Sequence, residues 1–273
     1  MTKGQSPKDA VRRYFDEEVA GYLDAYEAGR PGDARRDAFQ ERRDLVLAMM
    51  PASAARVLDI GAGPGVFTRR LLDRGSACWV VDLSYEMVAA ASRQLDGASR
   101  RACFMVGDLD RLPFADVSFD AVLCVGVLQY LPSLDFALAE LARVTVPGGH
   151  LVITCPNARS PLNALHRAAI AAARGGRAAA ARIGVATTPD PSRLTFREDI
   201  PNRWLSADEI ERRARAAGFA RDRVLYHVLQ FPFGVPGFGI VLRSWNRLVR
   251  GRFPRGRFAE WGREGIMRLT RLA

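Results

Sequence analysis

Glycines and a carboxylate stand together in the stretch VLDIGAGPG, residues 57–65. A short apolar run carries Asp59 near its end, and glycines follow at positions 61, 63 and 65. Glycines between a strand and a helix let the backbone approach a ligand closely, and the free N–H groups at the helix start attract electronegative atoms. The pattern predicts a small-ligand site in a strand-to-helix turn.

Two details of this turn argue against a nicotinamide dinucleotide as the ligand. Val66 stands where the dinucleotide fingerprint has its third glycine. Asp59 would place a fixed negative charge beside the turn, which repels a pyrophosphate and attracts an ammonium group. We therefore expect a ligand that has an amino-acid end and a nucleoside end but no phosphate.

Aspartates also end the next two predicted strands. Asp82 follows Gly61 by 21 residues, and a carboxylate there can accept hydrogen bonds from both hydroxyls of a ribose. Asp108, in GDLDRLPF, is placed for an exocyclic amine such as the adenine N6. One aspartate after a strand can equally be a helix cap or a turn residue. Three of them at successive strand ends favour a ligand site.

The elements that must position these residues follow an α/β pattern. Between Arg56 and Thr154, short apolar runs alternate with helical stretches, which is typical of a doubly wound sheet. Strands are predicted at 56–60, 77–83, 102–108, 119–125, 150–155 and 223–231, with a seventh at 265–272. Helices are predicted twice within 8–50, with a break at 29–32, from Leu134 to Gly148-Gly149, and from Ser206 to about Gly218.

Five motifs, taken in order along the chain, resemble the class I S-adenosylmethionine-dependent methyltransferases, in particular the small-molecule branch related to quinone-biosynthesis enzymes. The resemblance extends to the segment RWLSADEIERRARAAGF (203–219). The five motifs are VLDIGAGPG, VDLSYEMV, GDLDRLPF, FDAVLCVGVLQYL and LAELARVTVPGGHLVIT. The resemblance implies an α/β fold, with a doubly wound, mostly parallel, seven-stranded Rossmann-like sheet and helical cap elements. It also implies S-adenosyl-L-methionine as the cofactor.

The resemblance implies a role for each matching residue. Gly61, Ala62 and Gly63 would line the methionine portion of the cofactor, and Asp59 would orient its amino group. Asp82 would hold the ribose, with Leu83 and Met87 against the nucleoside, and Asp108 and Leu109 would read adenine. Val125 and Gly126 would lie near the sulfonium. Tyr22, with Tyr14 as second candidate, would cover the cofactor from an N-terminal lid helix, although packing of an amphipathic helix explains these tyrosines equally well.

Catalytic candidates are few. Many relatives have a histidine after the fourth strand, but here Tyr130 stands in that place, in LQYLP. His166 is the best histidine candidate for a general base, because it lies in the insertion that caps the acceptor pocket of such enzymes. His150 is expected to be exposed, and His227 is expected to be packed. We predict no metal site, and we expect Cys78, Cys103, Cys124 and Cys155 to be reduced thiols in buried strands.

The predicted organisation has four segments. Residues 1–54 form N-terminal lid helices, 55–155 the cofactor-binding core, 156–204 an acceptor-cap insertion, and 205–273 the completion of the sheet with a basic amphipathic helix. The net charge is +10, yet residues 1–165 carry 19 basic and 21 acidic residues, whereas residues 166–273 carry 21 arginines and nine acidic residues. The positive charge therefore belongs to the cap and tail.

We predict methyl transfer to a small, largely apolar metabolite at oxygen, nitrogen or carbon. The alternative is a quinone or lipid acceptor at a membrane surface, reached through the stripe of apolar residues flanked by arginines at 238–250. A nucleic-acid acceptor is disfavoured, because VGVLQYLP replaces the Asn/Asp-Pro-Pro-aromatic turn, and a cyclase on the same fold is a further alternative. We expect a cytoplasmic protein, with peripheral contact at the inner face of the membrane as the variant. The oligomeric state stays open.

Overall fold

The structure is a computed structural model of the chain of 273 residues. It describes residues 6–26, 34–95, 99–165, 167–168, 171, 200, 202–227 and 261–273. His166 and the stripe 238–250 lie outside the described residues. Among the described helices, none is both long and apolar enough to cross a bilayer.

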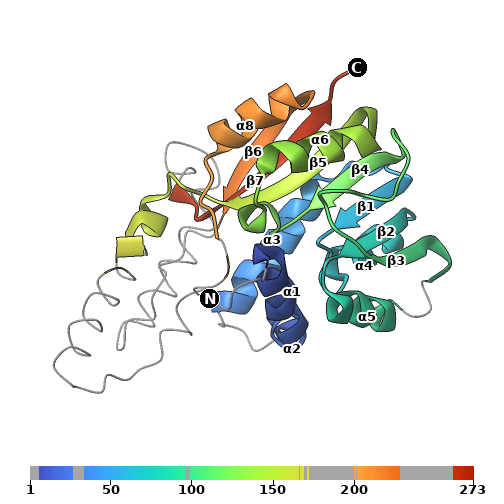
Figure 1. Cartoon of the computed structure of the whole chain (residues 1–273), viewed down its shortest axis with the longest axis horizontal. Coiled ribbons are helices and arrows are strands. Elements are labelled where there is room, and N and C mark those ends of the chain that lie inside the picture. The colour runs from blue at the N-terminus through green and yellow to red at the C-terminus, as the bar shows by residue number, and fades with distance from the viewer. Residues whose placement is uncertain are drawn as a thin grey trace.

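A single seven-stranded sheet forms the centre of the described fold, in the order β3-β2-β1-β4-β5-β7-β6 (Figure 1). β1 to β5 pair in parallel, and β7 is antiparallel to both of its neighbours. The predicted mostly parallel sheet is therefore confirmed. The strands are β1 (Arg56–Ile60), β2 (Ala77–Asp82), β3 (Ala102–Val106), β4 (Phe119–Cys124), β5 (Thr145–Pro156), β6 (Phe219–His227) and β7 (Glu264–Arg271).

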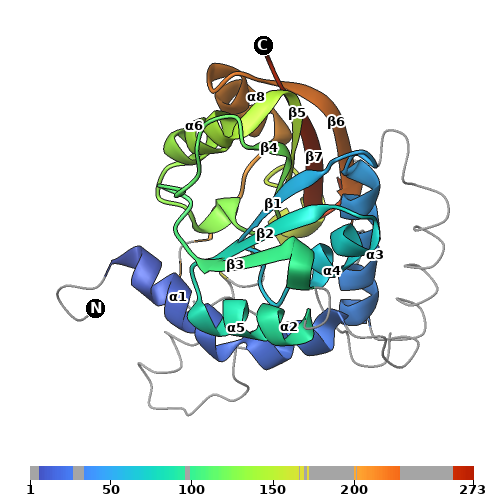
Figure 2. The same ribbon diagram turned by 90° about the vertical axis from the view of Figure 1, so that its right-hand side faces the viewer.

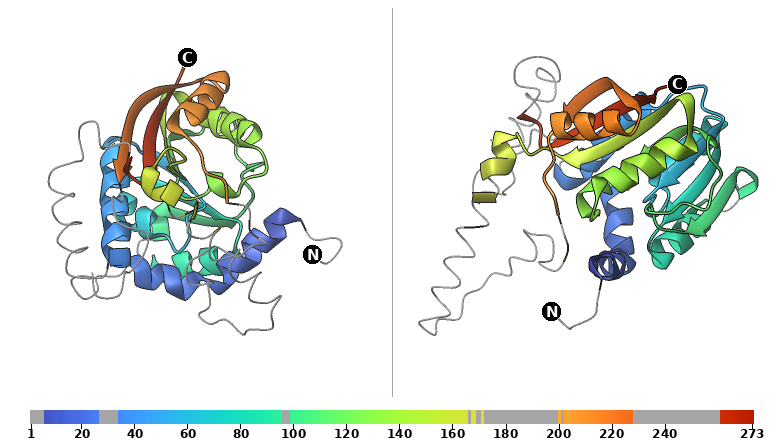
Figure 3. Two further views of the ribbon diagram at one scale, coloured as in Figure 1. Left: turned by 90° about the vertical axis from the view of Figure 1, so that its left-hand side faces the viewer. Right: turned by 45° about the horizontal axis from the view of Figure 1, so that its top comes forward.

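Helices cover both faces of the sheet (Figures 2 and 3). The helices are α1 (Pro7–Glu17), α2 (Val19–Tyr26), α3 (Ala34–Met49), α4 (Val66–Asp73), α5 (Tyr85–Gln94), α6 (Leu134–Val144) and α8 (Ala207–Ala216), with short 3-10 turns η1 (Ser99–Arg101) and η2 (Leu128–Tyr130). α3, α4 and α5 share one apolar cluster with the sheet, and α6 and α8 share the other. Both faces are thus buried, as continuous apolar strands require.

Several predicted boundaries differ from the observed ones. α6 ends at Val144 rather than at Gly148-Gly149, because Pro147 disfavours helical geometry at Val146 and the chain enters β5 directly. β6 begins at Phe219, four residues before the predicted start, because the buried Phe219 ring is drawn into the core. The N-terminal region has three described helices, since α1 ends at Glu17.

Cys103 is a further difference from the sequence prediction. Cys78, Cys124 and Cys155 are buried, but Cys103 is exposed. It lies on β3, which is one of the two edge strands of the sheet and has no fully buried residue. An apolar run therefore predicted the strand correctly, but it did not predict that the strand lies at the edge.

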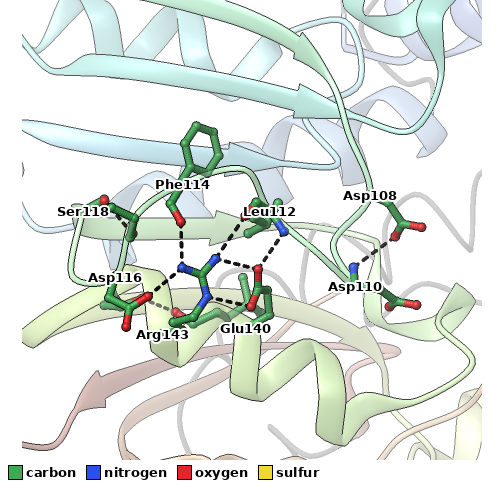
Figure 4. A network of polar contacts seen from close by, with 11 residues as sticks. Asp108, Asp110, Leu112, Phe114, Asp116, Ser118, Glu140 and Arg143 are labelled. Atoms are coloured by element: carbon green, nitrogen blue, oxygen red, sulfur yellow. Dashed lines mark hydrogen bonds and ion pairs between the residues drawn. The ribbon is translucent and has the colours of Figure 1, made fainter.

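Arg143 of α6 fixes the loop that follows β3 (Figure 4). Its guanidinium donates to the carbonyls of Leu112 and Phe114 at 3.1 and 2.7 Å and pairs with Glu140 and Asp116. Glu140 also accepts from the Leu112 N–H at 2.7 Å. Hydrogen bonds with a charged donor or acceptor are stronger than those between neutral groups, so these contacts hold the loop in a fixed position. The same loop begins with Asp108.

Candidate functional site

Two adjoining cavities lie at the carboxyl edge of the parallel strands. The first has a volume of about 100 Å³, and residues that follow β1, β2, β3 and β4 line it together with α1. The second has a volume of about 300 Å³ and extends toward α3, Trp204 and the start of β7. Six residues line both cavities: Tyr22, Gly61, Gly63, Val125, Gly126 and Tyr130. These shared residues define the junction between the two cavities.

The glycine turn supplies bare backbone at this junction. Gly61 and Gly63 have positive φ angles of 66° and 54°. The Gly61 N–H donates to the carbonyl of Val81 at 2.7 Å. A Cβ atom on Gly61 would lie only 2.1 Å from Cγ2 of Val127, so no larger residue fits. Ala62 lines the second cavity but not the first.

Asp82 lies in the wall of the first cavity, at the end of β2. It is 8% exposed, and its two carboxylate oxygens accept from the N–H groups of Gly63 (2.8 Å) and Ser84 (2.9 Å). Burial raises the pKa of Asp82 above its usual range. Each oxygen keeps a lone pair for a further donor, such as a ribose hydroxyl. Leu83 and Met87 line the same cavity.

Asp59 occupies a different position from the one that its place in the motif suggests. It is 1% exposed, lines neither cavity, and accepts a hydrogen bond from the Thr68 hydroxyl at 2.6 Å. Burial, with a smaller contribution from the nearby Asp82, raises the pKa of Asp59 to about 7. Direct contact with a cofactor amino group stays a prediction. The observed bond ties β1 to the first turn of α4.

Replacing Asp59 with asparagine should flatten the pH dependence of stability in the cofactor-free protein. A folded-state pKa of about 7 and an ordinary value of 3.8 mean that the folded chain binds the extra proton between these pH values. The free energy of unfolding of the wild type therefore falls as pH rises through this window. Between about pH 5 and pH 8.5 the free energy of unfolding of the wild type should therefore fall by on the order of 2–3 kcal/mol relative to that of Asp59→Asn, which has no carboxyl group to titrate at this position. Urea unfolding at a series of pH values measures the free energy of unfolding of both proteins. If it changes with pH in parallel for the two proteins, the prediction is wrong.

Asp108 and Leu109 both line the first cavity, but a lysine already engages the carboxylate. Lys8 of α1 donates to Asp108 at 2.6 Å and pairs also with Asp110. The other Asp108 oxygen accepts from the Asp110 N–H at 3.0 Å. An adenine amine would therefore share Asp108 with Lys8. This bridge joins α1 to the loop after β3, across the cavity.

Removing the Lys8 bridge should speed the loss of the expected cofactor. In Lys8→Met, α1 keeps the bond between Asp16 and the Ser84 hydroxyl (2.5 Å) but loses its tie to Asp108. A partly exposed ion pair is worth up to about 1 kcal/mol, so dissociation of S-adenosylhomocysteine should become about three- to fivefold faster. Stopped-flow fluorescence measures this rate. Arg12→Met is the matched control, because the ion pair that Arg12 forms among the described residues is with Asp9, within α1. Equal dissociation rates of S-adenosylhomocysteine from the two variants would show that the Lys8 ion pair does not keep α1 closed over the cavity.

Aromatic rings on α1 and α2 close the junction. Tyr22 lines both cavities, and its ring lies edge to face with Phe15 at 5.7 Å and with Phe39 at 6.2 Å between centroids. Burial raises the pKa of Tyr22 well above its usual value. Tyr14, the second candidate, packs edge to face against Phe15 at 5.0 Å between centroids and lines neither cavity.

Tyr130 lies at the junction in the place of the absent histidine. It is 6% exposed, and Phe15 packs edge to face against it at 5.4 Å. Burial raises the pKa of Tyr130, so the phenol stays protonated at neutral pH. Val125 and Gly126 adjoin it, and the Gly126 N–H donates to the Thr154 hydroxyl at 2.9 Å.

An ionic network in the wall of the second cavity has no signal in the sequence. Glu264 pairs with Arg42 (3.4 Å) and with Nε2 of His227 (2.8 Å). Although burial opposes it, the charge of Arg42 and the bond from His227 lower the pKa of Glu264 to about 2. Arg42 also donates to the Tyr26 hydroxyl and lies over the Phe39 ring at 4.5 Å. The partners are up to 222 residues apart, which no spacing rule reaches.

Comparisons with known proteins agree with this geometry. Residues 58–153 match a family model described as a methyltransferase domain. A demethylmenaquinone methyltransferase of Mycolicibacterium gilvum is 35% identical over 66% of this chain and 74% of its own length. Another of that name, from Thermobifida fusca, is 39% identical over 46% of this chain. The chain spans about half of that relative's length, 53%.

A solved structure shows the same fold over the whole length. The magnesium protoporphyrin IX methyltransferase of Synechocystis, with bound S-adenosylhomocysteine, has a TM-score of 0.64 to this chain at 17% identity. The match covers 97% of this chain and 99% of that one. At this identity the likeness concerns the fold.

Proposed function

Because the chain belongs to the class I S-adenosylmethionine-dependent methyltransferases, we propose that it transfers a methyl group from S-adenosylmethionine to a small-molecule acceptor. The observation that carries this proposal is the junction of the two cavities. One cavity has the features that suit a nucleoside, the other is open to a second molecule, and the glycine turn lies between them.

The residues present fit the cofactor on structural grounds. The turn at Gly61 leaves a cradle that a Cβ atom would fill, and the buried Asp82 carboxylate faces the first cavity with lone pairs to spare. In the proposed complex Asp82 holds the ribose, and Leu83, Met87 and Leu109 contact the nucleoside. Gly61, Ala62 and Gly63 hold the methionine end, whereas Asp59 acts through the turn that it supports.

The chain's own residues supply alignment and exclude water. S-adenosylmethionine, when bound, supplies an electrophilic methyl group. Val125 and Gly126 close the junction from the sheet side, while Tyr22 covers it from α2. In this proposal Tyr130, which lines both cavities, offers its hydroxyl as a hydrogen-bond donor to the acceptor. Holding two reactants in line is the main task in such a displacement, because it replaces a chance encounter by a fixed geometry.

The second cavity suits a ring-bearing metabolite. Tyr22, Tyr26, Phe39 and Phe67 line it, and Trp204 completes the aromatic wall. The segment 1–54 serves as the lid, 55–155 as the core, and 156–204 as the cap in this proposal. A quinone acceptor is the second candidate, because the relatives in Thermobifida fusca and Mycolicibacterium gilvum are named for demethylmenaquinone.

A turnover assay tests the proposal. Purified protein is incubated with S-adenosylmethionine and a metabolite extract, and mass spectrometry records S-adenosylhomocysteine and any product heavier by one methylene. Release of S-adenosylhomocysteine with such a product supports methyl transfer. Tight binding of the cofactor with product of unchanged mass would instead indicate a cyclase or another rearrangement on this fold. Absence of cofactor binding would overturn the proposal.

A further inference from the structure

The second cavity has a polar end as well as an aromatic wall. Gln129, Asn163, Asn202 and Arg263 line this end. Hydrogen bonds within the protein already satisfy Asn163, but two other polar atoms of this end, on Gln129 and Asn202, have no such partner, and an apolar acceptor would leave them unsatisfied. The polar end therefore carries information about the acceptor.

Arg263 is the cation of this end that lacks a counter-charge. Arg42 also lines the cavity, but Glu264 neutralises it. Arg263 donates through Nε to the Asn163 side chain at 2.9 Å, and no carboxylate of the described residues forms an ion pair with it. Burial lowers the pKa of Arg263, and the charge of the neighbouring Glu264, which is already bound to Arg42 and His227, offsets this only in part.

The backbone beneath Arg263 is fixed. Its carbonyl accepts from the Asn157 N–H at 2.8 Å and from the Asn163 side chain at 2.7 Å, and the Asn157 side chain donates to the Gly262 carbonyl at 2.9 Å. Asn157 and Asn163 are both buried. A guanidinium on such a base is preorganised, and its planar fork matches a carboxylate with two parallel hydrogen bonds.

Two acceptor atoms in the same cavity also lack donors. Oε1 of Gln129 and Oδ1 of Asn202 are buried without a hydrogen-bond partner among the described residues. Gln129 is 7% exposed and precedes Tyr130, with which its side chain forms a hydrogen bond. An amide oxygen accepts only from a donor, so the missing partner is an N–H or O–H group of the ligand, close to the junction.

From these groups we infer that the acceptor is an aromatic carboxylic acid that carries an amino or hydroxyl group, with the carboxylate on Arg263 and the N–H or O–H on Gln129. The inference rests on the proposed methyl transfer and names its substrate class. The lone pair of the acceptor nitrogen or oxygen forms the bond to the methyl carbon. The sulfur–methyl bond breaks and its electron pair stays on sulfur, which leaves neutral S-adenosylhomocysteine. The proton of the acceptor passes to water.

The test measures binding and turnover separately. Protein loaded with S-adenosylhomocysteine is titrated calorimetrically with 4-aminobenzoate, 4-hydroxybenzoate, benzoate, aniline and phenol. At least one of the first two should bind about tenfold or more tightly than benzoate, and equally more tightly than its own counterpart without the carboxylate, which is aniline for the amine and phenol for the hydroxyl compound. The same compounds are then offered with S-adenosylmethionine, and S-adenosylhomocysteine release is recorded. The amine and hydroxyl compounds distinguish the two possible acceptor atoms.

Variants assign each contact. Arg263→Gln should remove the advantage of the carboxylate, and Gln129→Leu should remove the advantage of the amino or hydroxyl group over benzoate. Arg159→Gln is the matched control, because Arg159 is exposed and pairs with Asp208 outside the cavity. Unchanged binding of S-adenosylhomocysteine in each variant shows that the fold is kept. If cofactor binds but carboxylate compounds gain nothing, or Arg263→Gln leaves their advantage intact, the inference is wrong while methyl transfer stands. If no cofactor binds, the proposed function fails.

Discussion

Replacing Gly61 with alanine should weaken binding of S-adenosylmethionine by at least about a hundredfold, which corresponds to some 2.7 kcal/mol. Two effects add. The backbone at Gly61 has a φ angle of 66°, where an L-residue costs about 1–2 kcal/mol. The new Cβ atom would also lie 2.1 Å from Val127, which must move into the first cavity that it lines. Isothermal titration calorimetry measures the loss.

Gly148→Ala separates these two effects. Gly148 has a φ angle of 74°, but a Cβ atom there would meet nothing within 4 Å. Both variants should lose stability to a similar extent through backbone strain, whereas only Gly61→Ala should lose the cofactor. Adding Val127→Ala to Gly61→Ala should restore part of the affinity by removing the overlap. Equal cofactor binding in the Gly61 and Gly148 variants would contradict the assigned role of the turn.

Replacing Asp82 with alanine should weaken S-adenosylmethionine binding by about 1–3 kcal/mol, which corresponds to roughly five- to 150-fold. The variant loses the charged acceptor for the ribose hydroxyls, and it also frees the N–H of Gly63, so the glycine turn loses a support. Asp82→Asn keeps one acceptor oxygen and should fall between the wild type and Asp82→Ala.

Asp73→Ala is the control for the Asp82 variants, because Asp73 is an exposed residue at the end of α4. Affinity should be compared for the cofactor and for methionine alone. The loss at Asp82 should be confined to the ligand that carries a ribose. A similar loss for methionine would place the effect in the turn and would remove Asp82 from the nucleoside site.

Much of this site can be predicted from the local sequence, because its glycine and aspartate residues lie at the carboxyl ends of successive strands. Parallel strands bring their carboxyl ends to one edge of the sheet, so Gly61, Asp82 and Asp108 meet although 47 residues separate the first from the last. Ser206 likewise accepts from the Glu209 N–H at 3.2 Å, as the capping pattern predicts. Periodicity and turn chemistry suffice for such features.

Other features depend on contacts that no local pattern encodes. Lys8 reaches Asp108 across 100 residues, and Arg42 reaches Glu264 across 222. The orientation of Asp59 toward Thr68 is a matter of packing in the core, so its place in the motif predicted a direct ligand contact that the cavity lining does not include. Arg263 lies in an arginine-rich tail, where composition alone does not distinguish the arginine that lines the second cavity.

A crystal structure with bound S-adenosylhomocysteine tests the central claim most directly. The adenosine should occupy the first cavity, with the ribose hydroxyls within hydrogen-bond distance of Asp82 and the sulfur at the junction beside Gly61 and Gly126. The thioether should open toward the second cavity. An adenosine bound elsewhere, or a sulfur that points away from the cavity lined by Arg263, would contradict the account.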